Sequence, residues 1–300
     1  MDGALDQGAG VVWSGDARDG FNGGGVFVRW IRPGRPSADV TEAVDHFAGA
    51  CDRVRVAPFI EGIPCSIHGF ACDDGIAVLR PVELVTLRPP TGARLRYAGA
   101  ATFFDPPVAD RNDMRAAAKR VGAHLVERHA FRGAFTIDGI LGADGWVPTE
   151  LNPRFGAGLG YAVAAIPDLP LDLLHHLVVA GDGHGVSAAE LEALILSVSD
   201  DHRWGGGWSS SSTGFERTES TPVVFTPDGA TCRRAADAEP ADAHILTGPG
   251  AEGGFIRITL APACTPVGPS IAPRIIAALH YADRDLRTAI GELTAPIPVR

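Results

Sequence analysis

The chain has almost no lysine. Lys119 is its single lysine, and 26 basic against 36 acidic side chains give the 300 residues a formal net charge of −10 at pH 7. No tract of consecutive basic residues offsets this charge, although such a tract is what draws a protein to nucleic-acid phosphates or anionic lipids. The composition therefore argues against binding to nucleic acid or to a membrane surface.

Long apolar runs are missing as well. No segment approaches the roughly eighteen uninterrupted apolar residues of a membrane-spanning helix, although 45% of the residues are hydrophobic. The first residues, Met-Asp-Gly-Ala-Leu-Asp, have neither the basic flank nor the apolar centre of a signal peptide. We therefore expect a soluble cytoplasmic protein with a substantial core.

Paired cysteines are also lacking. The five cysteines are odd in number and form no Cys-x-x-Cys pair; they are Cys51, Cys65, Cys72, Cys232 and Cys264. This pattern argues against a disulfide framework and against a zinc site. We expect reduced and mostly buried thiols.

The most informative segment runs from 135 to 154 and has the pattern of a β-hairpin. A turn at 143–145 makes Asp138 and Glu150 equidistant from Asp144, so the two carboxylates should face each other across the strands. Because side chains alternate along a strand, Asn152 and Arg154 should share the face of Glu150. Pro153 favours an extended conformation for Asn152. One surface should therefore carry two acids, an amide and a guanidinium.

Such a surface suits a hard cation. Opposed like charges destabilise a sheet, and a cation such as Mg²⁺, which accepts Asp, Glu and Asn oxygens, removes that repulsion. The alternative is a solvent-facing hairpin whose acids keep a sheet edge soluble. Apolar neighbours such as Phe135, Ile137 and Leu151 indicate a strand pair packed on a core, which favours the ligand interpretation.

The pattern of Asp138 followed by Glu150-x-Asn152-Pro153-Arg154 resembles the magnesium-binding end of the ATP-grasp superfamily, which includes many ATP-dependent ligases. The resemblance implies cofactors ATP and Mg²⁺ (or Mn²⁺), with the metal on Asp138, Glu150 and Asn152. It also implies a catalytic role for Arg154, on the transferring phosphoryl group or the acyl phosphate.

A glycine-rich segment lies between two apolar runs near the N-terminus. Asn22, Gly23, Gly24 and Gly25 form its centre and Arg29 follows. Successive glycines let backbone N–H groups approach an anion closely, although such a tract is also typical of a flexible hairpin tip. In the ATP-grasp family a glycine-rich flap in this order covers the triphosphate, so the resemblance makes these residues candidate nucleotide ligands.

The segment 53–69 resembles the family's hinge, where adenine would meet the backbone near Ala57, Pro58, Phe59 and Ile60. Glu61 would reach the ribose, or it is a solvated turn carboxylate. Further along, Arg80 and Glu83 would line the phosphate side of the cleft, or they form an ordinary pair on a strand surface.

Two features depart from the family. Trp13 stands where the family commonly has a lysine that meets the phosphates, and Arg18 or Arg29 would have to supply that charge with a different geometry. The flap also begins near Met1, so we expect the family's usual N-terminal α/β domain to be missing. Three explanations stay open: a longer gene product, a partner that supplies the domain, or a degenerate relative.

The expected fold is α+β, an ATP-grasp-type two-lobe fold with antiparallel sheets. Its expected parts are a flap lobe (1–60), a magnesium- and nucleotide-binding lobe (61–203), a flexible loop (204–220) and a small C-terminal α+β subdomain (221–300). Periodic apolar residues predict a helix over 111–129 and another beginning at Ser37.

The resemblance implies an ATP-dependent ligase that activates a small-molecule carboxylate as an acyl phosphate for attack by an amine. The alternatives are a non-catalytic or partner-completed ATP/Mg-binding module and a metal-binding β-rich scaffold without nucleotide. A homo-oligomer is a further open possibility.

Overall fold

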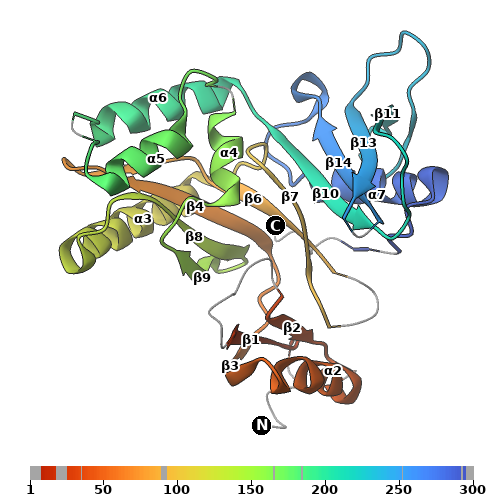
Figure 1. Cartoon of the computed structure of the whole chain (residues 1–300), viewed down its shortest axis with the longest axis horizontal. Helices are drawn as coiled ribbons and strands as arrows, with labels where there is room; N and C mark the ends of the chain where they lie inside the picture. Colours follow the sequence, from red (N-terminus) through yellow and green to blue (C-terminus); the bar gives the residue numbers. More distant parts are fainter. Residues whose placement is uncertain are drawn as a thin grey trace.

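The computed structural model describes residues 8–17, 26–34, 36–88, 93–164, 166–183, 185–251, 253–291 and 293–294. Figure 1 shows a small N-terminal lobe below a larger body built around one long twisted sheet, with its helices on both sides. All hydrogen-bonded pairs between the named strands are antiparallel. The expected α+β class with antiparallel sheets is thus confirmed.

The small lobe is a three-stranded sheet with one helix behind it. Its strands β1 (Val11–Ala17), β2 (Val28–Ile31) and β3 (Cys51–Pro58) lie in the order β2-β1-β3, and α2 (Pro36–Ala48) covers one face. Val11, Ile31, Ala43 and Phe47 form its core, against which Trp13 also packs. The helix expected from Ser37 is therefore present, and it begins at Pro36.

The large body contains an eleven-stranded sheet with the order β12-β11-β13-β14-β10-β7-β6-β4-β8-β9, to which β5 is added through β4. Its first half consists of β4 (Ile63–Ala71), β5 (Ile76–Val78), β6 (Val82–Leu87), β7 (Arg96–Ala101), β8 (Gly133–Gly142) and β9 (Gly145–Asn152). Its second half consists of β10 (Gly205–Ser211), β11 (Glu219–Phe225), β12 (Cys232–Arg234), β13 (Ala243–Gly250) and β14 (Gly253–Leu260).

The helices cover both faces of this sheet. The long helix α3 (Val108–His129) packs on the face that carries Ile67, Phe135 and Ile137. The opposite face of the same strands lies under α4 (Ala157–Val163), α5 (Leu171–Ala180) and α6 (Ala188–Asp201). Strand β4 is consequently buried along its whole length.

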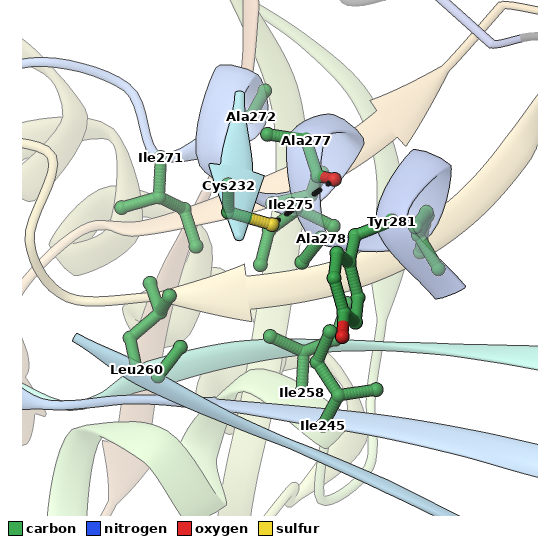
Figure 2. Close-up of a cluster of buried hydrophobic side chains, with 14 of the residues drawn as sticks. Cys232, Ile245, Ile258, Leu260, Ile271, Ala272, Ile275, Ala277, Ala278 and Tyr281 are labelled. Atoms are coloured by element: carbon green, nitrogen blue, oxygen red, sulfur yellow. Dashed lines mark hydrogen bonds between the residues drawn. The ribbon is translucent and has the colours of Figure 1, made fainter. Parts of the chain in front are cut away.

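The C-terminal part has a core of its own. Helix α7 (Ala272–Leu286), preceded by a short 3₁₀ turn (Pro262–Cys264), packs on β10 to β14. Figure 2 shows Ile275, Ala278 and Tyr281 of α7 directed at Ile245 and Ile258 of the sheet. Cys232 lies in this core too. Four of the five cysteines are buried and Cys264 is exposed, in agreement with the expectation of mostly buried thiols.

Part of the segment 204–220 is a strand rather than the flexible loop that its glycine and serine content predicts. Residues Gly205–Ser211 form β10, which lies between β7 and β14 inside the large sheet. A Cβ on Gly207 would come within 2.7 Å of the Ala98 carbonyl oxygen, so a residue without a side chain lets the two strands approach. Composition favoured a loop, whereas pairing with strands distant in sequence produces a strand.

Within the described residues, no helix is both long and apolar enough to cross a membrane.

The structure also locates Glu83, which the sequence placed either at the phosphate side of the cleft or in a surface pair. Its carboxylate is buried and accepts hydrogen bonds from the Ser270 hydroxyl and, at 3.0 Å, from the Ile271 backbone N–H. Glu83 thus holds the start of α7 against β6, and neither sequence interpretation of it is right.

Glu83→Gln should flatten part of the pH dependence of stability. Burial raises the pKa of Glu83 from 4.5 to about 7, so the folded state binds this proton more tightly than the unfolded state. The free energy of unfolding should therefore fall as pH rises from about 4.5 to about 7, and stay level above that. At roughly 1.4 kcal/mol per pKa unit the loss is of the order of 3 kcal/mol.

Urea denaturation of wild type and variant at pH 5 and pH 8 measures this effect. The glutamine can still accept from Ile271 and donate to Ser270, so the variant keeps both contacts without a titratable group. An equal drop in stability between the two pH values in both proteins would contradict the assignment.

Candidate functional site

The acids of the 135–154 hairpin do face each other, through a different turn from the one expected. Gly142 pairs with Gly145, so the turn has the two residues Ala143 and Asp144, with Gly145 at φ 102°. The register then shifts between Asp138 and Gly139, because Thr149 is an extra residue on β9. This bulge sets Asp138 opposite Glu150. Without it Glu150 would point to the other face of the sheet.

Asp138 is held by hydrogen bonds on both of its oxygens. The Ser66 hydroxyl, on the neighbouring strand β4, donates to Oδ1 at 2.5 Å, and the Asn152 amide nitrogen donates to Oδ2 at 3.0 Å. Burial raises the pKa of Asp138, and the Ser66 bond and the Arg154 charge oppose that rise. The orientation of the carboxylate is therefore fixed, but its negative charge is only partly compensated.

Glu150 is more exposed than Asp138, but its ionised form is disfavoured as well. Its pKa is raised by burial and then by the nearby Asp138 carboxylate, while Asn152, Arg154 and Arg55 act in the opposite direction. Two carboxylates whose ionised forms are both disfavoured thus lie side by side. A bound cation would relieve this repulsion.

Asn152 and Arg154 lie at the end of the hairpin beside the acids. The Arg154 guanidinium donates to the Asn152 side-chain oxygen at 3.3 Å and to the Phe155 carbonyl at 3.4 Å. Arg154 is exposed, and these long contacts leave most of its five donors directed to solvent. The hairpin therefore gathers the four side chains that the sequence placed on one surface.

The donors at this site are all oxygens. Asp138, Glu150 and Asn152 supply two carboxylates and an amide, a set that fits Mg²⁺ or Mn²⁺ better than the softer zinc. In the part of the chain that the structure describes, no group of three or more His, Cys, Asp and Glu side chains has metal-binding geometry. A metal at this site would thus be coordinated by the two acids, the amide oxygen and further oxygens from a ligand or water.

The glycine-rich candidates Asn22, Gly23, Gly24 and Gly25 lie outside the described residues, as does Arg18. Arg29 is described and buried on β2. Its guanidinium donates to the carbonyls of Val26 and Val28 at 2.9 and 2.8 Å, and lies 3.6 Å from Glu42. The Arg29 guanidinium therefore makes its contacts within the small lobe.

The hinge candidates Ala57 and Pro58 end β3, and Phe59, Ile60 and Glu61 lead from it into β4. The Phe59 backbone N–H donates to the Gly10 carbonyl at 2.9 Å, so this N–H already has a partner within the small lobe. The Phe59 ring stacks on Trp30 at 4.6 Å between centroids.

Arg88 also contacts the hinge residues Phe59 and Glu61. Its guanidinium lies 5.3 Å from the Trp30 ring centroid and 5.8 Å from that of Phe59, and bonds the Glu61 carboxylate at 3.0 Å. Glu61 is therefore part of an ion pair rather than a solvated turn residue. A ribose contact would have to share this carboxylate with Arg88.

Arg80 belongs to a different network. Its guanidinium is paired with Asp105 at 2.8 Å and with Asp200, which lies at the end of α6. Asp105 also accepts from Arg111 on α3 at 2.8 Å. In this arrangement Arg80 joins the ends of two helices to the segment between β5 and β6, and none of its described contacts reaches Asp138 or Glu150.

Sequence reasoning missed Ser66 and Tyr97. Tyr97, on β7, has its pKa raised mainly by burial, with smaller contributions from Tyr161 and Asp138. Ser66 contacts Asp138 only because β4 pairs with β8 across about seventy residues. No local pattern around Ser66 carries that information.

No protein-family model and no curated protein matches the chain. Among solved structures, pyruvate carboxylase from Rhizobium etli matches 96% of this chain and 24% of its own chain, at 15% identity and a TM-score of 0.52. Carboxyaminoimidazole ribonucleotide synthase from Aspergillus clavatus, complexed with ATP, matches 90% of this chain and 60% of its own, at 13% identity and a TM-score of 0.47. L-amino acid ligase from Bacillus licheniformis matches 83% and 58%, at 15% identity and a TM-score of 0.44.

Over most of its length the chain is thus similar in fold to pyruvate carboxylase, which agrees with the fold that the resemblance of the hairpin implied. This likeness of fold rests on the match to pyruvate carboxylase. The chain spans about a quarter of that protein and about three fifths of the other two.

Asp138→Asn should lower the pKa of Glu150 in the metal-free protein. The neighbouring carboxylate is the second cause of its elevation, after burial, and asparagine keeps the size of the side chain while removing the charge. Carbon NMR of the Glu150 carboxyl across a pH titration measures the shift. Asp144→Asn, in the exposed turn of the same hairpin, is the matched control; an unmoved Glu150 titration in Asp138→Asn would show that the two acids do not interact.

Proposed function

We propose that the chain binds Mg-ATP at the hairpin and activates a carboxylate substrate as an acyl phosphate, which an amine substrate then attacks to form an amide. The observation that supports this most directly is the acid pair of Asp138 and Glu150 with Asn152 and Arg154 at its edge. The likeness of fold to pyruvate carboxylase is consistent with the proposal.

Asp138, Glu150 and Asn152 would hold the metal. When bound, Mg²⁺ would neutralise part of the negative charge of the triphosphate. Ser66 keeps one Asp138 oxygen oriented through its 2.5 Å hydrogen bond, so the acid does not need to reorganise when the cation arrives. Because the raised pKa of each acid favours its protonated form, metal binding should weaken as the pH is lowered.

The reaction itself needs little covalent chemistry from the protein. The substrate carboxylate would attack the γ-phosphorus, ADP would leave, and the amine would then attack the acyl carbon with release of phosphate. Positioning and charge neutralisation account for most of the catalysis of phosphoryl transfer. Arg154, exposed beside the acids with most of its donors directed to solvent, would stabilise the charge that develops on the transferred oxygens.

A second candidate function is a nucleotide-binding module without turnover, completed by a partner. Its support comes from the described part of the small lobe, where Trp13 packs in the core and Arg29 is bound to backbone carbonyls. Trp13 carries no charge, and the Arg29 guanidinium is occupied by contacts within the small lobe. Neither residue is therefore placed to neutralise a triphosphate. This candidate predicts nucleotide binding without ADP release.

Glu150→Gln should weaken Mg-dependent ATP binding at least tenfold and leave the fold intact. The substitution removes one of two ionised metal ligands while keeping the size of an exposed side chain. Calorimetric titration with ATP, with and without Mg²⁺, measures the loss. Glu190→Gln, on the exposed side of α6, serves as the control, and equal affinity in wild type and Glu150→Gln would remove Glu150 from the site.

Arg154→Gln should separate binding from chemistry. If the guanidinium acts on the transferring phosphoryl group, the variant should release ADP at least a hundredfold more slowly while its affinity for Mg-ATP changes less than about fivefold. ADP release is followed with mixtures of small carboxylates and amines. A wild-type protein that binds Mg-ATP but releases no ADP with any mixture would favour the module, and one that binds no nucleotide would refute both candidates.

A further inference from the structure

A cavity of about 500 Å³ lies at the outer edge of strand β5. Within the described chain, β5 pairs with β4 alone, so its other edge faces no strand. One wall of the cavity is Lys119 of α3, and the opposite wall is formed by α6. Because α3 and α6 cover opposite faces of the sheet (Figure 1), the cavity occupies the place where a further strand would lie.

The pairing of β5 with β4 decides which backbone groups point into this cavity. The Leu79 N–H, just beyond β5, donates to the His68 carbonyl of β4 at 2.9 Å. Hydrogen-bonded and non-hydrogen-bonded positions alternate along an antiparallel ladder. The backbone N–H and C=O groups of Ile76 and Val78 therefore point away from β4 and toward the cavity.

Val78 agrees with this direction and shows where the edge is closed. Its N–H donates to the Glu192 carboxylate and its carbonyl accepts from the Arg115 guanidinium, both at 2.7 Å. Arg115 and Glu192 also form an ion pair at 2.5 Å, which bridges α3 and α6 across the edge. In the part of the chain that the structure describes, no such side chain bonds the Ile76 backbone. The cavity is therefore a slot along the sheet edge, closed at Val78 and open at Ile76.

The closed end of the slot carries a net positive charge. Arg115 and Lys119 bring two cationic groups to the single carboxylate of Glu192. That carboxylate is engaged by Arg115 and by the Val78 N–H, and it lies 3.8 Å from Lys119. Lys119, whose side chain is 55% exposed, is the cation most accessible to a ligand. Charge complementarity therefore favours a carboxylate over an ammonium group at this end.

The other walls suit apolar side chains. Ala189 and Ala193, both exposed on α6, and the partly exposed Leu196 line the cavity with apolar groups. Asp74, at the open end, accepts a hydrogen bond from the Ala188 N–H at 2.9 Å, so its charge is already partly compensated. A peptide matches all of these features, because it offers N–H and C=O groups to a strand edge, apolar side chains to α6 and a carboxylate at its end.

We propose that this slot binds the C-terminal end of an extended peptide, which adds to β5 as a parallel strand. The last residue of the peptide donates its N–H to the Ile76 carbonyl, and the carbonyl two residues earlier accepts from the Ile76 N–H. The terminal carboxylate then lies at the closed end and pairs with Lys119. This binding goes beyond the proposed ligase activity and requires neither ATP nor a divalent cation.

Calorimetry on the full chain, in buffer without nucleotide or divalent metal, tests the proposal with the peptide acetyl-Val-Ala-Leu. The peptide should bind saturably with a dissociation constant of about a millimolar or lower. Its C-terminal carboxamide should bind at least about tenfold more weakly, because it has no charge for Lys119. N-methylation of the leucine removes the donor to Ile76 and should also weaken binding severalfold.

Acetyl-leucine distinguishes a peptide from a small acylated amino acid. It keeps the carboxylate and the last N–H, but it lacks the earlier carbonyl that accepts from Ile76. We expect it to bind severalfold more weakly than the peptide.

Lys119→Gln should weaken the peptide at least about tenfold. Arg120→Gln removes the charge of the next residue on α3, which is exposed outside the cavity, and is the matched control. Ala193→Leu should fill the slot and abolish binding, whereas Ala116→Leu, at an exposed position of α3, should not. Glu150→Gln should leave the peptide affinity unchanged, which keeps this outcome separate from that of the proposed function.

Three results would overturn the proposal. The first is the absence of saturable binding of acetyl-Val-Ala-Leu to the wild-type protein. The second is equal affinity for the peptide and its carboxamide, or for wild type and Lys119→Gln, which would remove the carboxylate contact. The third is equal affinity for the peptide and acetyl-leucine, which would remove the pairing with the edge of β5.

Discussion

The candidate site depends on two carboxylates that are forced to face each other across β8 and β9. Their ionised forms are disfavoured by burial, and for Glu150 also by the neighbouring charge. A fold gains no stability from such a pair unless something positive compensates it. The bulge at Thr149 and the Ser66 hydrogen bond keep the pair in place, and Arg154 compensates part of the charge. The arrangement is therefore one that a bound cation would stabilise.

Local chemistry in the sequence was sufficient to place these side chains on one surface. Alternation along two strands and the symmetry about Asp144 gave the correct pairing of Asp138 with Glu150. The turn was nevertheless wrong, because a two-residue turn followed by a bulge and a three-residue turn produce the same pairing in this stretch. A symmetric count along the chain cannot distinguish them, since both shift the register by one residue.

The features that the sequence could not supply depend on contacts between distant segments. β10 is a strand because β7 and β14 lie on either side of it, and its glycines alone favoured a loop. Glu83 is buried because the start of α7, nearly 190 residues later, supplies its hydrogen-bond donors. Glu61 and Arg80 likewise have partners that charge patterns did not identify. Polar residues reveal their chemistry in a sequence, but their partners are decided by the topology.

The small lobe is joined to the body by contacts that limit how the two can move relative to each other. Arg88 contacts Trp30, Phe59 and Glu61 together, and the Trp30 backbone N–H donates to Ala93, in the connection between β6 and β7, at 2.7 Å. Ala93 is therefore bound to the small lobe, while β7, which follows it, belongs to the central sheet. A movement of the small lobe relative to the central sheet would have to carry Ala93 with it or break the cation–π contacts, each worth of the order of 1 kcal/mol. Because that cost is small, these contacts orient the small lobe on the body without locking it in place.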